Sequence, residues 1–215
     1  MKVNSVSSQN FQARNQTIRF ADDIARRVNT CYPRLSSTTF IDLENSGKFK
    51  NSLDKLDDRI NKMRMYKYDL FDYAKDVVGK SAALIYPIKR YHCGNCGESA
   101  HLSAIAAKIN GIRNCYPAML ITKEGKNLDH AVLLVKGEKP YIIDSWLGFA
   151  DYVPNAMIRF KSEFLQHFDC EPNSKLELVR PPKSYDSFLN RNFDEKDIEK
   201  LRTLMPEVVI KKRNK

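Results

Sequence analysis

The chain has 215 residues with 36 basic and 26 acidic side chains, which gives a formal net charge of +10. Its 42% of hydrophobic residues are enough to build the core of one domain and exclude a fully disordered protein. No apolar run approaches the roughly 18–20 residues that cross a bilayer, and the N-terminal residues lack the apolar stretch of a secretory signal. We therefore expect a globular protein without a transmembrane segment, either cytoplasmic or delivered by a non-classical secretion system.

The positive charge is spread along the chain, and its clearest cluster is the C-terminal segment 211–215, which is typical of a solvated chain end. A nucleic-acid-binding surface is normally a clustered basic patch with interleaved aromatic or helix-borne contacts. The sequence therefore predicts a protein or peptide substrate as the partner and no specific nucleic acid.

The N-terminal half is predicted to be helical. Residues 1–18 are rich in Ser, Asn and Gln, which predicts a flexible polar leader ahead of a single domain over 19–215. A short helix is expected over 20–29. Residues 51–78 carry apolar side chains at steps of three and four, which predicts one amphipathic helix that ends at Gly79.

The second half mixes helices with short strands. Residues 97–110 predict a helix lined with small side chains, which can pack closely against its neighbours. Strands are expected over 116–122, 130–136, 140–146 and 174–180, and further helices over 154–168 and 194–205. This order predicts an α+β fold in which the helix at 97–110 packs on an antiparallel sheet.

Cys96 has the surroundings that a thiol nucleophile needs. It directly precedes a predicted helix, whose N-terminal dipole and unpaired N–H groups favour a thiolate and can bind a developing oxyanion. Gly94 and Gly97 let backbone and substrate approach closely. A nucleophilic thiol also needs a base within reach and a third group that orients the base.

His130 and Asp144 are the candidate base and orienting group. If residues 137–139 form the loop between two antiparallel strands, Val132 lies opposite Asp144. His130 and Val132 point to the same face of their strand, so His130 and Asp144 become diagonal neighbours on one face. A two-residue loop would place them on opposite faces.

Three motifs surround these residues. They are Gly94-Asn95-Cys96-Gly97-Glu98-Ser99-Ala100, Asp129-His130-Ala131-Val132 and Ile143-Asp144-Ser145-Trp146-Leu147-Gly148. Together, over about residues 90–150, they resemble the transglutaminase-like and papain-like cysteine enzymes. The short spacing from nucleophile to base and from base to orienting group is more similar to transglutaminase-like proteins and bacterial papain-fold toxin or effector domains than to papain peptidases.

This resemblance implies a papain-like or transglutaminase-like fold, with a nucleophile helix on an antiparallel sheet and a helical N-terminal half. It implies acyl transfer with Cys96 as nucleophile, His130 as general base and then acid, and Asp144 as its orienting group, with no cofactor and no metal. The expected reaction is glutamine deamidation or transglutamination of a protein, of bacterial effector type. Alternatives are a papain-like cysteine peptidase and an inactive interaction module on the same fold. Asn95 is a candidate second oxyanion donor, and Trp146 a candidate wall of the substrate groove or a shield for the base.

Other interpretations of the cysteines stay open. Five cysteines without an export signal favour free thiols over a disulfide framework. Cys93 and Cys96 form a Cys-x-x-Cys motif, which is also found in redox pairs and in half of a zinc site. A structural zinc site needs about four ligands, and His92, His101 and Cys115 would complete one only without regular spacing. The arylamine N-acetyltransferases share a Cys-x-Glu and the same Cys-His-Asp order, but the rest of their N-terminal pattern is not found here.

Overall fold

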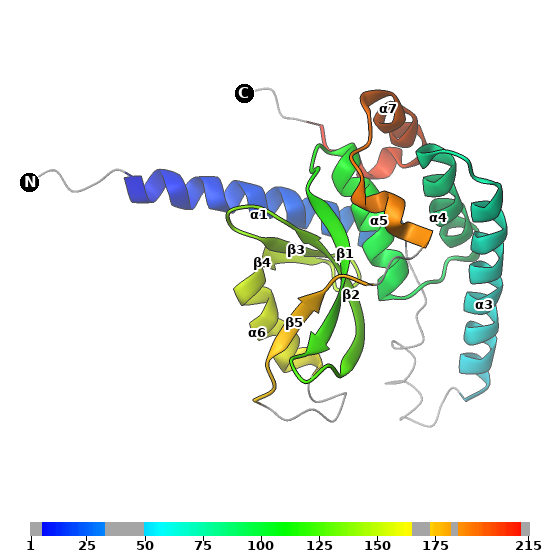
Figure 1. Ribbon diagram of the computed structural model, residues 1–215, viewed down its shortest axis with the longest axis horizontal. Helices are drawn as coiled ribbons and strands as arrows, with labels where there is room; N and C mark the ends of the chain where they lie inside the picture. The colour runs from blue at the N-terminus through cyan, green and yellow to red at the C-terminus, as the bar shows by residue number, and fades with distance from the viewer. Residues whose placement is uncertain (1–5, 33–49, 165–172, 182–184, 212–215) are drawn as a thin grey trace, which may run out of the picture.

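The computed structural model describes residues 6–32, 50–164, 173–181 and 185–211 of the chain. These residues form an α+β fold in which helices cover both faces of a five-stranded antiparallel sheet (Figure 1). The helices are α1 (Val6–Cys31), α3 (Lys50–Tyr73), α4 (Val77–Tyr91), α5 (Cys96–Ile109), α6 (Val153–Phe164) and α7 (Glu195–Leu204), with short 3₁₀ helices η1 (Tyr185–Asn190) and η2 (Pro206–Val208). The strands are β1 (Cys115–Thr122), β2 (Asn127–Val135), β3 (Tyr141–Asp144), β4 (Phe149–Tyr152) and β5 (Leu176–Val179).

The sheet has the strand order β4-β3-β2-β1-β5, and each neighbouring pair is antiparallel. In the β2–β3 pair, Leu133 lies opposite Ile143 and Val135 lies opposite Tyr141. Continued by one residue, this register brings Val132 level with Asp144, so the register predicted from the three-residue loop is confirmed.

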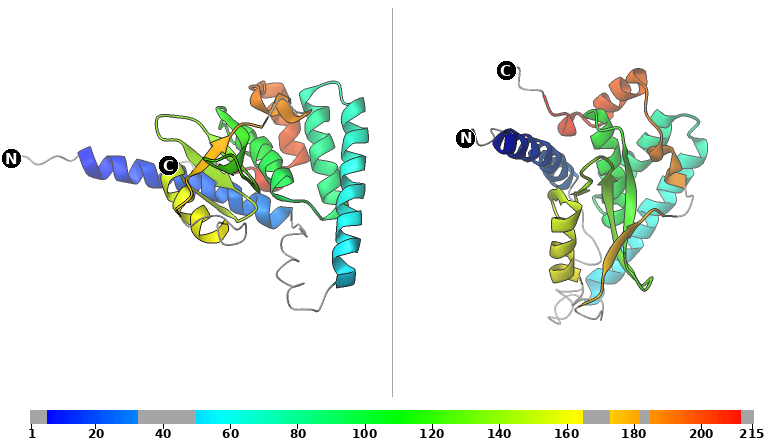
Figure 2. Two further views of the ribbon diagram at one scale, coloured as in Figure 1. Left: turned by 60° about the horizontal axis from the view of Figure 1, so that its bottom comes forward. Right: turned by 60° about the vertical axis from the view of Figure 1, so that its left-hand side comes forward.

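Two apolar cores lie on the two faces of the sheet, because successive side chains of a strand point to opposite sides. Leu133 and Ile143 belong to the larger core, which they form with α1, α3, α4, α5 and α7. Val132 and Ile142 belong to the smaller core, which α6 closes with Phe160. Figure 2 shows these layers from two further sides, with α6 on one side of the sheet and α5 on the other.

Helix α5 is the centre of the larger core. Its small side chains at Ala100, Ala104 and Ala107 are almost completely buried, as are its larger apolar residues. Its polar residues from Glu98 to Lys108 are buried as well, so neighbouring elements enclose the helix on nearly every side. Because these neighbours hold α5 in place, they also hold its first residue, Cys96.

Several predicted boundaries are wrong. The predicted helix over 51–78 is two helices, because Asp76 caps a new helix by accepting a 2.7 Å hydrogen bond from the N–H of Gly79. Gly79 therefore lies in the first turn of α4 and does not end a helix. The strand expected over 140–146 ends at Asp144, and a turn then leads to β4, which was not predicted.

Helix α1 is much longer than the helix expected over 20–29. Within the predicted leader over residues 1–18, the described part is helical from Val6, and the first half of α1 projects away from the rest of the protein (Figures 1 and 2). The later elements, α6, β5 and α7, lie where they were expected, to within a few residues. His167, expected to be a packing or surface residue, and Cys170 lie outside the described residues. Within the described part of the chain, no helix is both long and apolar enough to cross a membrane.

Candidate active site

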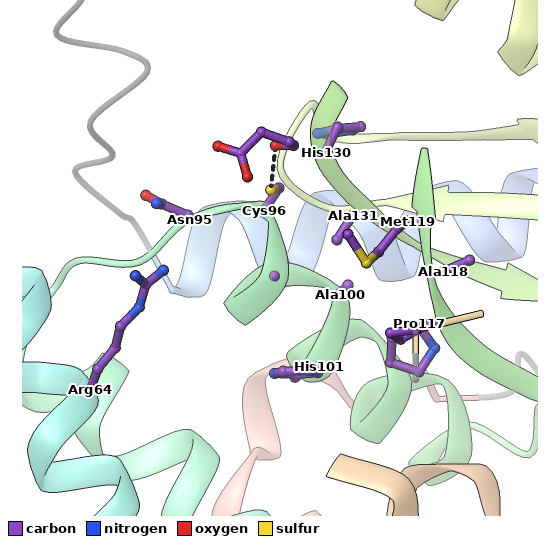
Figure 3. A pocket seen from close by; sticks show the side chains of 13 residues that line it. Arg64, Asn95, Cys96, Ala100, His101, Pro117, Ala118, Met119, His130 and Ala131 are labelled. Carbon is purple, nitrogen blue, oxygen red and sulfur yellow. Dashed lines mark hydrogen bonds between the residues drawn. The ribbon is translucent and has the colours of Figure 1, made fainter. Parts of the chain in front are cut away.

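Cys96, which was predicted to lie directly before a helix, is the first residue of α5. Its thiol donates a hydrogen bond to the backbone carbonyl of Asp129, with 3.3 Å between Sγ and the oxygen (Figure 3, dashed line). The N–H groups in the first turn of a helix have no carbonyl partner within it. Those of α5 therefore surround the thiol with donors that can face a negatively charged oxygen.

Asp129 was not singled out from the sequence, but its backbone shapes the site. It has a positive φ of 45°, a conformation that Asn and Asp tolerate better than most residues. Its N–H donates to Asn127 Oδ1 at 2.9 Å, which holds this turn in place. The turn presents the Asp129 carbonyl to the thiol immediately before His130 begins the regular part of the strand.

His130 and Asp144 form a buried pair. His130 Nε2 lies 2.7 Å from Asp144 Oδ2, and each side chain is only 1% exposed. The ring of His130 also packs against Trp146 and, edge-on, against Phe160, at centroid distances of 5.6 and 5.5 Å. These rings keep water from the His–Asp hydrogen bond, which is the shielding role that the sequence allowed for Trp146.

The environment of His130 favours its charged form. Burial by itself would lower the pKa of this imidazole, but the Asp144 carboxylate and, to a smaller extent, the Cys96 thiol raise the pKa to about 10. Because Nε2 is bonded to Asp144, Nδ1 is the ring nitrogen that remains for the thiol. The structure thus brings the three predicted residues to one place, with His130 hydrogen-bonded to Asp144 and lining the same cavity as Cys96.

Asp144 is oriented by its own turn. Its Oδ1 accepts hydrogen bonds from the N–H groups of Trp146 and Leu147, both at 3.0 Å, which leaves Oδ2 for His130. From α1, the side-chain amide of Asn29 donates to the carbonyls of Ser145 and Trp146 at 2.8 and 3.1 Å. Helix α1 therefore holds the turn that holds the carboxylate.

Replacing Asn29 with alanine is expected to lower the free energy of unfolding by about 1–2 kcal/mol, because one partly buried and one exposed hydrogen bond to backbone carbonyls are lost. Thr30→Ala, at the exposed neighbouring position of α1, is the matched control. Chemical denaturation of both variants checks this result. Equal stabilities of the two variants would mean that Asn29 does not hold the turn.

Behind the nucleophile lies a buried ion pair that the sequence did not reveal. Lys67 Nζ lies 2.9 Å from Glu98 Oε1, and these two side chains are 2% and 5% exposed. Arg64 approaches the same carboxylate at 3.4 Å, and Glu98 Oε2 accepts the N–H of Asn95 at 3.0 Å. Burial would raise the pKa of Glu98, but the two cations and this N–H lower it to about 2. Glu98 thus does more than interact with the helix dipole, because it fixes the residue before the nucleophile to α3.

Beside the thiol is a cavity of about 250 Å³. Its apolar wall comes from α5, β1, β2 and the residue after Arg180: Ala100, Pro117, Ala118, Met119, Ala131 and Pro181. Arg64 and Asn95 lie on one side of Cys96 and His130 on the other (Figure 3). Asn95 therefore lines the cavity, whereas Trp146 is not among the lining residues.

The structure also bears on the other interpretations of the cysteines. Cys31, Cys93, Cys96 and Cys115 are free thiols, and Cys93 is buried beside the more accessible Cys96. Among the described residues, no three His, Cys, Asp or Glu side chains are grouped as a metal site requires. The zinc interpretation of the Cys-x-x-Cys motif therefore lacks a ligand set in this part of the chain.

Comparisons of the chain with protein-family models, with curated proteins and with solved structures give no match.

Proposed function

We propose that the protein is a cysteine-dependent acyl-transfer enzyme that acts on carboxamide side chains of proteins, as a glutamine deamidase or transglutaminase on a papain-like or transglutaminase-like fold. The observation that carries the proposal is the buried His130–Asp144 hydrogen bond of 2.7 Å next to Cys96 at the start of α5, with Cys96 and His130 lining the same cavity. A thiol, a base and an orienting group in this order are the requirements for nucleophilic catalysis by cysteine.

In the first half of the proposed reaction, the Cys96 thiolate attacks the carbonyl carbon of the amide. The N–H groups at the start of α5 stabilise the negative oxygen of the tetrahedral intermediate. The intermediate collapses as His130 donates its proton to the departing nitrogen. Ammonia leaves, and the acyl group stays on Sγ as a thioester.

In the second half, water or a primary amine attacks the thioester. His130 accepts the proton of the attacking group, a second tetrahedral intermediate forms, and Cys96 leaves as thiolate. Water yields the carboxylic acid, which is deamidation, and an amine yields a new amide, which is transglutamination. Asp144 serves throughout as a positioning residue that keeps the imidazole oriented and stabilises its positive charge.

The dimensions of the cavity favour a side chain as the acyl donor. Its volume of about 250 Å³ is below the range of about 300–1,000 Å³ of pockets that enclose drug-sized ligands. Its apolar wall suits the methylene groups of a glutamine, whose carboxamide would reach the thiol. An extended peptide, as a peptidase binds it, needs a longer groove.

The test is an assay of the full chain on casein and on N-protected glutaminylglycine, with and without the amine cadaverine. Expected products are free ammonia and glutamate without the amine, or incorporated cadaverine with it, as identified by mass spectrometry. Cys96→Ala and His130→Gln are expected to abolish product formation. Cys31→Ala, which removes an exposed thiol elsewhere, is expected to leave it unchanged.

Two results would overturn the proposal. Cleavage of the casein backbone without loss of side-chain amides would identify a peptidase. Absence of every product, together with absence of an acyl adduct on Cys96, would identify a non-catalytic module.

A further inference from the structure

A second cavity, of about 340 Å³, lies where the α5–β1 loop, the end of β2, the end of β5 and the η1–α7 loop meet. It shares no lining residue with the catalytic cavity. Three basic side chains line it, from Arg113, Lys136 and Arg180, and three side-chain amides join them, from Asn114, Asn190 and Asn192. We call this cavity the basic pocket.

The basic side chains of this pocket have little negative charge to neutralise them. Lys136 and Arg180 both lie over the ring of Tyr116, each 5.0 Å from its centroid, and neither forms an ion pair within the described part of the chain. Arg113 pairs with Glu195 at 3.2 Å, but these side chains are 64% and 77% exposed, and such pairs contribute little. Two cations held on one aromatic ring repel each other, so a bound anion would offset an electrostatic repulsion that is already present.

A further positive charge lies behind the pocket wall. The ammonium group of Lys108 is buried and donates to the carbonyls of Arg191 at 2.8 Å and Arg113 at 3.4 Å. No described carboxylate forms an ion pair with it, and burial lowers its pKa, against a weaker opposing effect of Cys115. Charges of one sign inside low-dielectric walls reinforce the potential in a cleft.

The same contacts hold the pocket in shape. Lys108 joins the α5–β1 loop to the η1–α7 loop, and the backbone N–H of Lys136 donates to the carbonyl of Asn114 at 2.8 Å. The loops that carry the lining residues are therefore fixed to one another before any ligand arrives. A site fixed in this way loses less conformational entropy when it binds.

We propose that the basic pocket binds a small phosphate-bearing anion with more than one phosphoryl group. Phosphoryl oxygens accept hydrogen bonds from arginine guanidinium groups, lysine ammonium groups and amide N–H groups, and the basic pocket offers all three. Nucleic acid is a poorer occupant, because the cations converge on a hollow and already cover the face of Tyr116, on which a base would stack.

Isothermal titration calorimetry of the full chain with tripolyphosphate, at constant ionic strength, tests this site. Saturable binding with one ligand per chain is expected. Lys136→Gln/Arg180→Gln should weaken it by about tenfold or more, because hydrogen bonds to charged groups are lost. The matched control, Lys55→Gln/Lys75→Gln, removes the same charge from exposed positions of α3 and the α3–α4 connection, and should bind as the wild type does.

Each alternative outcome would overturn the proposal. No saturable binding would mean that the pocket is not an anion site. If both double variants lose the same affinity, tripolyphosphate binds only through the net charge of +10 and not in the pocket. Binding of a random single-stranded oligonucleotide that requires Lys136 and Arg180, without binding of tripolyphosphate, would identify a nucleic-acid surface. If the pocket variant has a lowered melting temperature, the single variant Arg113→Gln, at an exposed side chain, replaces it.

Discussion

Iodoacetamide is expected to alkylate Cys96 about 10 to 100 times faster than Cys31 near pH 6. Cys31 is an exposed free thiol in the same chain and therefore an internal control. An ordinary thiol is only about 0.3% ionised near pH 6, whereas Cys96 faces an imidazole that keeps its proton well above neutral pH. Peptide mass spectrometry after short exposures gives the rate at each cysteine.

The variant His130→Gln isolates the effect of the positive charge. Glutamine retains an N–H that can reach Asp144 but carries no charge, so the rate at Cys96 is expected to fall to that of Cys31. If both cysteines already react at equal rates in the wild type, the imidazole does not activate the thiol. The catalytic proposal would then fail before any substrate is tried.

The charge on His130 also makes the stability of the fold depend on pH. Its pKa is about 10 in the folded protein and 6.5 in the reference state, so its stabilising contribution is complete below about pH 6.5 and is lost as the pH rises through about 10. The free energy of unfolding of the wild type is therefore expected to fall more steeply across this range than that of His130→Gln. Urea denaturation at a series of pH values measures the difference.

Replacing Lys67 with methionine is expected to destabilise the protein by about 3–5 kcal/mol, because it leaves the Glu98 carboxylate buried with only the more distant Arg64 as a cation. The second variant Lys67→Met/Glu98→Gln removes both charges and keeps an acceptor for the N–H of Asn95. It is expected to recover most of the lost stability, as measured by urea denaturation.

A matched control lies on the same helix. Lys62 pairs with Asp58 at 2.6 Å, but these side chains are 63% and 61% exposed, so Lys62→Met is expected to leave stability unchanged within error. Acid provides an independent check. The low pKa of Glu98 means that its contribution is present above about pH 4.5 and is lost as the pH falls towards about 2. A double variant no more stable than Lys67→Met would show that packing, and not the charge pair, explains the loss.

The sequence predicts most of what depends on local pattern. The register of β2 and β3 follows from loop length and strand alternation, and it correctly brings His130 and Asp144 together. The helix start at Cys96 follows from the residues around it. The break between α3 and α4 was missed because a helical stripe continues across it, and only the cap at Asp76 marks the new start.

What the sequence could not predict depends on tertiary neighbours. Lys67 continues the buried stripe of Leu56, Ile60 and Met63 at helical spacing, so a lysine on an apolar face was the available signal. Its partner Glu98 is on another helix, and nothing in the local pattern joins the two. The same is true of Asn29, which reaches the Asp144 turn from the other end of the chain.

The loop between β2 and β3 combines freedom of sequence with restriction of length. Residues 137–139, between the pocket residue Lys136 and Pro140, are exposed, and exposed loops usually accept insertions at little cost. Here a single inserted or deleted residue would turn β3 over relative to β2 and move Asp144 to the other face of the sheet, away from His130, unless a bulge absorbed the change. Among homologues that keep Cys96, His130 and Asp144, the length of this loop should therefore differ in steps of two residues.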